Sequence, residues 1–191
     1  MSKINPQLFC ENTPTSPFPF TWQPFIVDGH VYATDGRIAV KIKQECAVEF
    51  TKYYEDNYKK VIAKKINDHL AENTNQEFRA FSELEDASNH IKTCATCDGK
   101  GKFDISEHYN DGKQHLYDCE ECDGTGKVLF TPFKVENTIF NARYLNLIQD
   151  NLPNPQVALP PAADAIDEME PALIKFDGGE CVLMPIFEDQ K

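Results

Sequence analysis

Two short cysteine motifs constrain this chain more than any other feature of its sequence. Residues 94–101 read CATCDGKG and residues 119–126 read CEECDGTG, so the frame Cys-x-x-Cys-Asp-Gly-x-Gly occurs twice. Two cysteines separated by two residues can reach one metal ion, and a second such pair completes a tetrahedral zinc site. We therefore predict one zinc ion per chain, held by four thiolates: Cys94, Cys97, Cys119 and Cys122.

The residues around these cysteines fit a structural site. The two glycines of each motif allow tight turns behind the thiolates, including positive φ values that other residues adopt only at a cost. Because four protein thiolates leave no open coordination position, we expect the zinc to be structural and not catalytic. Twenty-one residues separate Cys97 from Cys119, and we expect them to form a hairpin or loop across Asn110-Asp111-Gly112.

Two other interpretations of the four cysteines remain open: simple reduced or disulfide-linked cysteines, and a redox-active dithiol. In a reducing compartment, spaced cysteine pairs more often bind metal than form disulfides. The remaining cysteines, Cys10, Cys46 and Cys181, are expected to be small buried apolar residues. The five histidines are expected in the core or on the surface rather than as ligands.

Composition limits the class of protein. A length of 191 residues allows one domain with an insertion or two small domains, and 41% hydrophobic residues suffice for a core. No apolar run approaches the roughly 18 to 20 residues of a membrane helix, and the first residues lack the apolar core of a signal peptide. We expect a soluble cytoplasmic protein without a membrane partner. A net charge of −12 argues against a protein that binds nucleic acid over its whole surface, but it permits a local basic face.

Hydrophobic patterning predicts an α+β fold around the cysteine segment. Two Asp-Gly turns within residues 24–43 predict two or three antiparallel strands. A helix is predicted at 51–72, a short one within 73–92, and another beginning after Asn141. A strand or hairpin is predicted at 127–140, and three strands should follow the last helix, the final two forming a hairpin.

The helix predicted at 51–72 carries lysines away from its apolar stripe. Tyr54, Tyr58, Ile62 and Ile66 recur at four-residue steps, with Val61 and His69 beside them. At about 100° per residue, the opposite side holds Lys52, Lys59, Lys60 and Lys64. Two interpretations stay open for these lysines: a solvated surface and a face that contacts phosphates.

Both cysteine motifs resemble the repeats of the DnaJ-type zinc-finger region, the cysteine-rich module of the Hsp40 co-chaperones. The resemblance covers about residues 94–127. That module carries four repeats and two zinc ions, whereas this chain has two repeats and lacks the His-Pro-Asp signature of a J domain. The resemblance implies one alternative function, a polypeptide-binding or chaperone-accessory module.

The flanking segments resemble a second family, the bacterial sliding clamps (DNA polymerase III beta subunit). VYATDGRIAVKI is similar to a strand-turn-strand segment of the clamp, and TIFNARYLNLIQDNLPNPQVAL, PALIKF and GGECVLMPI together look like its final half-domain. The resemblance covers about residues 25–70 and 128–187. It implies a clamp-like antiparallel sheet with two helices on one face and an inserted zinc-knuckle hairpin.

Together these observations predict a domain organisation. Residues 1–24 form an irregular arm, residues 25–92 and 128–191 form the clamp-like domain, and residues 93–127 form the zinc-binding insert. In the clamp family the helices line the DNA-facing side of a ring, which implies DNA contact for Lys52, Lys59, Lys60 and Lys64. Encirclement of DNA by this chain would require a homo-oligomer.

No catalytic signature accompanies these features. The chain lacks a phosphate loop, a zinc-protease helix, a nucleophile elbow and a dinucleotide fingerprint, so we do not expect an enzyme. The predicted function is a non-enzymatic, zinc-binding, sliding-clamp-like protein that interacts with DNA or with replication or repair proteins. The chaperone-accessory module is the alternative, and thiol-disulfide exchange would require a labile or absent zinc.

Overall fold

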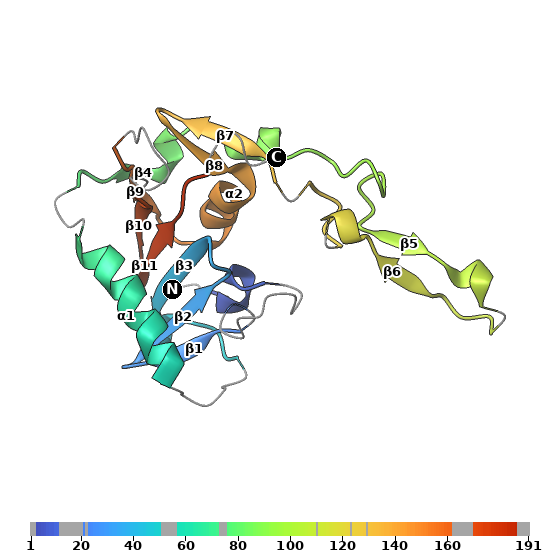
Figure 1. Ribbon diagram of the computed structural model, residues 1–191, viewed down its shortest axis with the longest axis horizontal. Helices are drawn as coiled ribbons and strands as arrows, with labels where there is room; N and C mark the ends of the chain where they lie inside the picture. Colours follow the sequence, from blue (N-terminus) through green and yellow to red (C-terminus); the bar gives the residue numbers. More distant parts are fainter. Residues whose placement is uncertain are drawn as a thin grey trace.

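The structure is a computed structural model with a main body and an insert that projects from it (Figure 1). It describes residues 3–11, 21, 23–50, 57–72, 76–109, 111–122, 124–128, 130–161 and 170–186. The body is built on one seven-stranded sheet in which every pairing is antiparallel. The predicted α+β class is confirmed.

The sheet joins chain segments from both sides of the cysteine insert. Its strand order is β1-β2-β3-β11-β10-β9-β4. The central pair is β3 with β11, in a register that runs from Ile38 opposite Leu183 to Ile42 opposite Gly179. The strands are β1 (Phe25–Val27), β2 (His30–Thr34), β3 (Ile38–Lys43), β4 (Arg79–Ala80), β9 (Gln156–Ala158), β10 (Ala172–Phe176) and β11 (Gly179–Leu183).

Asp-Gly turns set the register of the first three strands, as predicted. Asp28 and Gly29 both have positive φ, 48° and 74°, which is the two-residue hairpin geometry that Asp-Gly favours. At the second turn the Asp35 carboxylate accepts hydrogen bonds from the backbone N–H groups of Arg37 (2.9 Å) and Ile38 (3.0 Å). The local sequence therefore fixes this part of the sheet.

The two α-helices of the described residues lie on opposite faces of the sheet. Helix α1 (Asn57–Glu72) packs Ala63 and Ile66 against Phe25 and Tyr32. Helix α2 (Ala142–Asn151) instead buries Tyr144, Leu145 and Ile148 in the large core on the other side, where Val31, Val40 and Ile174 also lie. The prediction of two helices on one face is therefore wrong.

The physical reason lies in the strands. Successive strand side chains point to opposite faces, and the central strands place apolar residues on both. In β2, Val31 and Ala33 belong to the α2 core while Tyr32 between them belongs to the α1 core. A sheet that is apolar on both faces must be covered on both, so each helix takes one face.

Helix α2 begins where the sequence predicts. The Asn141 side chain accepts a hydrogen bond from the Arg143 N–H (3.2 Å) and caps the helix. It also accepts one from the Thr131 N–H (3.2 Å), which ties the helix start to the preceding hairpin. That hairpin consists of β7 (Pro132–Val135) and β8 (Thr138–Asn141).

The segment before the insert differs from the prediction. Instead of a short helix, described residues 76–92 contain β4 and two 3-10 turns, Phe81–Glu83 and Ala87–His90. The Asp86 carboxylate accepts a hydrogen bond from the Ser88 N–H (2.8 Å), a local turn that competes with continued helix. Tertiary packing of Phe81 and Ala87 in the main core fixes these turns.

The described part of the N-terminal arm packs on the body. Phe9 is almost fully buried, and the 3-10 turn Pro6–Phe9 precedes Cys10. The Ile4 N–H donates to the Cys46 carbonyl and the Ile4 carbonyl accepts from the Val48 N–H, each at 2.8 Å. Arm residues 12–20 and 22 lie outside the described residues.

The insert carries a small ribbon of its own. Strands β5 (Lys102–Asp104) and β6 (Leu116–Asp118) pair antiparallel, and the ribbon extends away from the sheet (Figure 1). None of the helices in the described part of the chain has the length and apolar character required to span a bilayer.

Candidate metal centre

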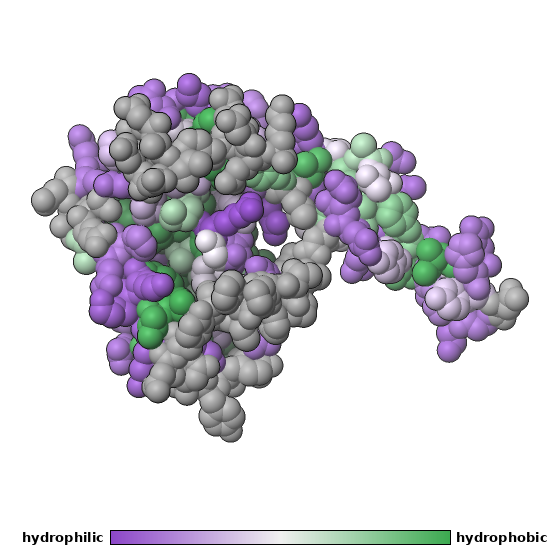
Figure 2. All heavy atoms as spheres, viewed as in Figure 1, coloured by the Kyte–Doolittle hydropathy of each residue, from purple (hydrophilic) through white to green (hydrophobic). Residues whose placement is uncertain are grey.

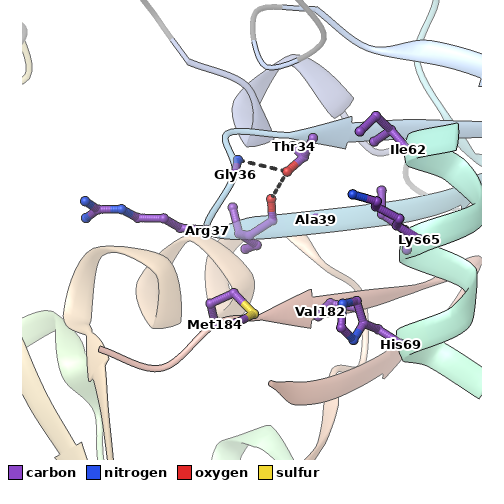
Figure 3. A pocket seen from close by; sticks show the side chains of 11 residues that line it. Thr34, Gly36, Arg37, Ala39, Ile62, Lys65, His69, Val182 and Met184 are labelled. Atoms are coloured by element: carbon purple, nitrogen blue, oxygen red, sulfur yellow. Dashed lines mark hydrogen bonds between the residues drawn. The ribbon is translucent and has the colours of Figure 1, made fainter. Parts of the chain in front are cut away.

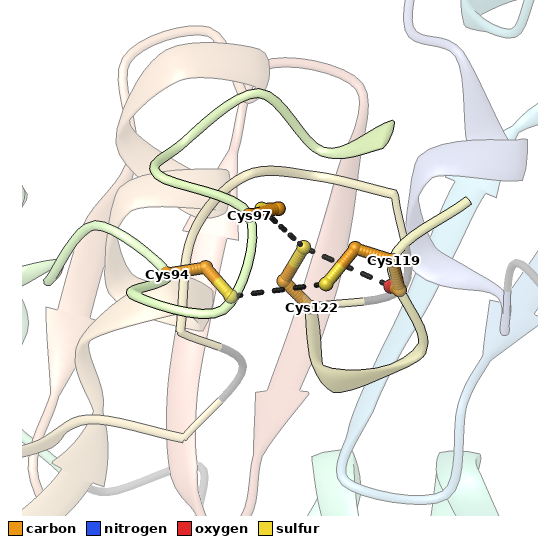
Figure 4. A group of neighbouring side chains, drawn as sticks. All are labelled: Cys94, Cys97, Cys119 and Cys122. Atoms are coloured by element: carbon orange, nitrogen blue, oxygen red, sulfur yellow. Dashed lines mark hydrogen bonds between the residues drawn. The ribbon is translucent and has the colours of Figure 1, made fainter. Parts of the chain in front are cut away.

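The four predicted cysteines meet at the base of the insert (Figure 4). Their Sγ atoms all lie within 4.8 Å of one another. The Cys94 and Cys119 sulfurs are 3.9 Å apart, and the Cys97 and Cys122 sulfurs are 3.7 Å apart. A tetrahedron with Zn–S bonds of about 2.3 Å places its sulfurs about 3.8 Å from one another. The cluster therefore has the dimensions to hold a metal ion.

Burial closes the cluster from solvent. Each of the four cysteines is at most 3% exposed, and together they form a group separate from the main core. Among the described residues, no other group of three or more His, Cys, Asp or Glu side chains could hold a metal ion. A closed set of four protein ligands is typical of structural rather than catalytic metal sites.

The two motifs form matching turns around their second cysteines. The Gly101 N–H donates to the Cys97 sulfur (3.3 Å), and the Gly126 N–H donates to the Cys122 sulfur (3.2 Å). Hydrogen bonds of this kind stabilise negative charge on a sulfur. The repeated glycine of each motif thus places a donor behind a ligand, which the spacing alone does not reveal.

The motifs also hold each other through their backbones. The Cys94 N–H donates to the Gly126 carbonyl (2.9 Å), and the Cys119 N–H donates to the Gly101 carbonyl (2.8 Å). Each motif therefore supplies the last glycine that fixes the first cysteine of the other. This reciprocal pairing brings the two sulfur pairs into one cluster.

The electrostatics of the cluster call for a cation. Burial raises the pKa of the Cys94 thiol, but hydrogen bonds from the Cys97 and Thr96 backbone outweigh it and lower that pKa to about 7. Burial raises the pKa of the Cys119 thiol to about 12, and a hydrogen bond with Cys122 adds to the effect. Four thiolates cannot form together at neutral pH unless a cation neutralises them.

The donor set limits the choice of cation. Four thiolates in a tetrahedral arrangement suit zinc or iron, and they do not suit magnesium or calcium, which prefer oxygen ligands. The residues present therefore fit the zinc ion that the sequence predicts.

The other cysteines have different surroundings. Cys10 and Cys181 are buried in the main core, as predicted, whereas Cys46 is only partly buried. Burial raises the pKa of the Cys10 thiol to about 12 and raises that of Cys181 further. These thiols remain protonated at neutral pH and act as apolar side chains.

The proposed DNA-contacting lysines lie on α1, away from the metal centre. Lys60 and Lys64 are exposed and Lys59 is partly buried, and the Lys64 ammonium forms an ion pair with Asp68 at 2.6 Å. Lys52 lies outside the described residues. On the same helix Ile62 and Ile66 face the sheet as predicted, while Val61 is 49% exposed.

A pocket beside α1 is a further candidate site that the sequence did not indicate. It has a volume of about 180 Å³ and lies between α1 and strands β3 and β11 (Figure 3). Ile62 and Ile66 line one wall, and Ala39 and Val182 form part of the floor. Its walls come from three segments distant in sequence, so no local pattern marks it.

Neither a known family model, a curated protein nor a solved structure matches the chain. The resemblances to the DnaJ-type zinc finger and to the sliding clamp therefore have no support from these comparisons.

Proposed function

We propose that this chain is a non-enzymatic binding protein in which one zinc ion per chain holds the insert in a fixed shape. The observation that carries this proposal is the group of four buried sulfurs spaced as a tetrahedral metal site requires. The complete set of thiolate ligands leaves no position for a substrate or a metal-bound water, which supports a structural role.

Metal analysis of the purified protein tests the zinc assignment. We expect one zinc per chain by elemental analysis and native mass spectrometry. We also expect zinc affinity to fall as the pH is lowered, because protons compete for the thiolates. A variant with Cys46→Ser should retain the metal, and one with Cys97→Ser should lose it. Metal-free protein with oxidised cysteines would contradict the assignment and favour thiol-disulfide exchange, whereas bound iron would correct the identity of the ion.

The proposed role is in DNA replication or repair, through contact with DNA or a replication protein. Residues 57–72 of α1 contain four lysines and two carboxylates, Asp68 and Glu72. This segment therefore has a net charge of +2, although the whole chain has a net charge of −12. Charges farther apart than about 8 Å are screened at physiological salt, so this local excess can act on a nearby phosphate backbone. Because α2 lies on the other face of the sheet, only α1 is proposed to face DNA.

Charge reversal on α1 tests direct DNA contact. Combining Lys59→Glu, Lys60→Glu and Lys64→Glu should weaken binding to a short duplex about tenfold or more in a fluorescence-anisotropy titration. The slope of log affinity against log salt should fall by about 0.9 for each lost phosphate contact. The matched control is Lys134→Glu, at an exposed position on β7. Wild-type protein that fails to bind the duplex at low salt would exclude direct contact.

A further inference from the structure

The insert exposes most of the large apolar side chains found on the described surface. Six large hydrophobic side chains are exposed among the described residues, and four of them belong to the insert. These four are Phe103 (37% exposed), Tyr109 (50%), Leu116 (52%) and Tyr117 (49%). Figure 2 shows apolar atoms along this projecting part of the molecule. Exposed apolar side chains that cluster in this way mark interaction sites.

The aromatic residues gather on one face of the β5-β6 ribbon. Phe103 and Tyr117 lie directly opposite each other in the register, so they share a face. The Ile105 N–H donates to the His115 carbonyl (2.9 Å), which continues this register. The Tyr109 ring stacks on the His115 ring, with the two ring centroids 4.1 Å apart. Leu116 points to the other face. All residues of both strands are exposed, so no layer of the described body covers the aromatic face.

The insert is also acidic. Residues 93–127 contain four lysines and eight Asp and Glu residues, a net charge of −4. Aromatic side chains that stack on single-stranded nucleic acid normally lie in a positively charged groove. The charge of the insert therefore disfavours nucleic acid and favours a partner surface that is apolar and bordered by cations.

The pocket beside α1 offers such a surface. Its walls are mainly apolar, and its lining also includes Lys65, His69 and Arg37; the Arg37 side chain extends outward (Figure 3). Its volume of about 180 Å³ exceeds the roughly 150 Å³ of a cavity that binds benzene, so it can accept one aromatic ring. The adjoining helix has a net charge of +2 over residues 57–72.

We propose that the aromatic face of the ribbon in one chain docks into the α1 pocket of a second copy, with Phe103 or Tyr117 entering the pocket. The two surfaces are complementary in both charge and apolar character. Helix α1, which forms one wall of the pocket, lies across the body from the β5-β6 ribbon, so the ribbon of a chain does not reach the pocket of the same chain (Figure 1). The contact is head-to-tail, and repetition produces a closed ring or an open chain of copies.

The proposal rests on the proposed zinc site, because the metal centre fixes the direction in which the ribbon projects. Acidic and basic surfaces meet in the contact, so association should weaken as salt rises. The overall charge of −12 on each copy opposes association through longer-range repulsion, which salt also screens. A loss of association at high salt therefore reports the local contact rather than the net charge.

Two complementary variants test the proposal on the full-length, metal-loaded chain. The ribbon variant combines Phe103→Ser with Tyr117→Ser, and the pocket variant combines Arg37→Glu with Lys65→Glu. Wild-type protein should show concentration-dependent association by sedimentation velocity, and each variant alone should associate about tenfold or more weakly. An equimolar mixture should form a heterodimer, because one intact ribbon and one intact pocket remain.

Matched controls and metal content make the result decisive. Leu116→Ser removes an apolar side chain at least as exposed as Phe103 and Tyr117 from the opposite face of the ribbon, and Lys134→Glu reverses a charge away from the pocket; both variants should associate like wild type. A wild-type monomer at every concentration, or a mixture that fails to form a heterodimer, would overturn the proposal. Binding of an unfolded client protein to the ribbon, in place of a second copy, would also overturn the proposal. Zinc measured in the same samples separates these outcomes from failure of the metal site.

Discussion

Removal of zinc with a strong chelator is expected to unfold residues 93–127 while the seven-stranded sheet stays folded. Among the described residues of this insert, the buried ones are the four cysteines and two glycines, Gly101 and Gly126. The insert therefore has no apolar core to replace the metal. Zinc contributes on the order of 10 kcal/mol to the folding of small modules of this kind.

Hydrogen exchange measures this separation directly. The Cys94 and Cys119 amides, which pair with the opposite motif, should lose protection when the metal is removed. The amides that pair β3 with β11 should keep theirs, because the main core does not involve the insert. Cys119→Ser should reproduce the effect without chelator, and Cys46→Ser should not. Insert amides that stay protected without metal, or a sheet that unfolds along with them, would contradict this expectation.

Gly101→Ala is expected to disrupt the metal centre almost as severely as loss of a ligand. Gly101 has φ of 74°, and a Cβ there would overlap the carbonyl oxygen of Gly124 and lie 2.9 Å from its carbonyl carbon. The clash is with backbone, which cannot rotate away. Any shift also disturbs the Gly101 hydrogen bonds to Cys97 and Cys119. We expect a loss of zinc affinity of about 10- to 100-fold, the range seen when groups that orient metal ligands are removed.

A second glycine distinguishes two causes of this effect: the strain of a left-handed backbone conformation and the close contact with Gly124. Gly112 has nearly the same φ, 71°, but a Cβ there would meet nothing within 4 Å. Gly112→Ala therefore incurs only the free-energy cost of the left-handed conformation, about 1 to 2 kcal/mol. It should leave zinc affinity unchanged. Competition with a chromophoric chelator compares the variants. Equal effects at positions 101 and 112 would show that backbone strain, and not the close contact of the two motifs, decides metal binding.

Local signals in the sequence predicted much of the fold because local hydrogen bonds decide those elements. Asp28-Gly29 and Asp35 specify turns through positive φ and side-chain acceptors, and Asn141 caps α2 through its own amide oxygen. The same holds for the metal centre, where the spacing of each cysteine pair and its glycines is a local property. These signals required no knowledge of what packs around them.

Other features were beyond prediction because distant segments compete for the same surface. The 3-10 turns at 81–90 replace an expected helix because Phe81 and Ala87 pack into a core formed largely by residues after the insert. The pocket beside α1 combines residues from three segments. The amphipathic pattern of α1 indicated that one side is buried, but not which face of the sheet buries it.

By itself, the sequence determined which four cysteines cluster as a candidate metal centre, where the hairpin turns lie, and which sides of α1 and α2 are apolar. The tertiary structure decided that the helices cover opposite faces, that β3 and β11 join the two halves of the chain, and that α1 and the β5-β6 ribbon lie on different sides of the body. The physical reason is that turns, caps and paired ligands depend on neighbours along the chain. The choice of face and the shape of the surface depend instead on burying the apolar area of the whole chain at once.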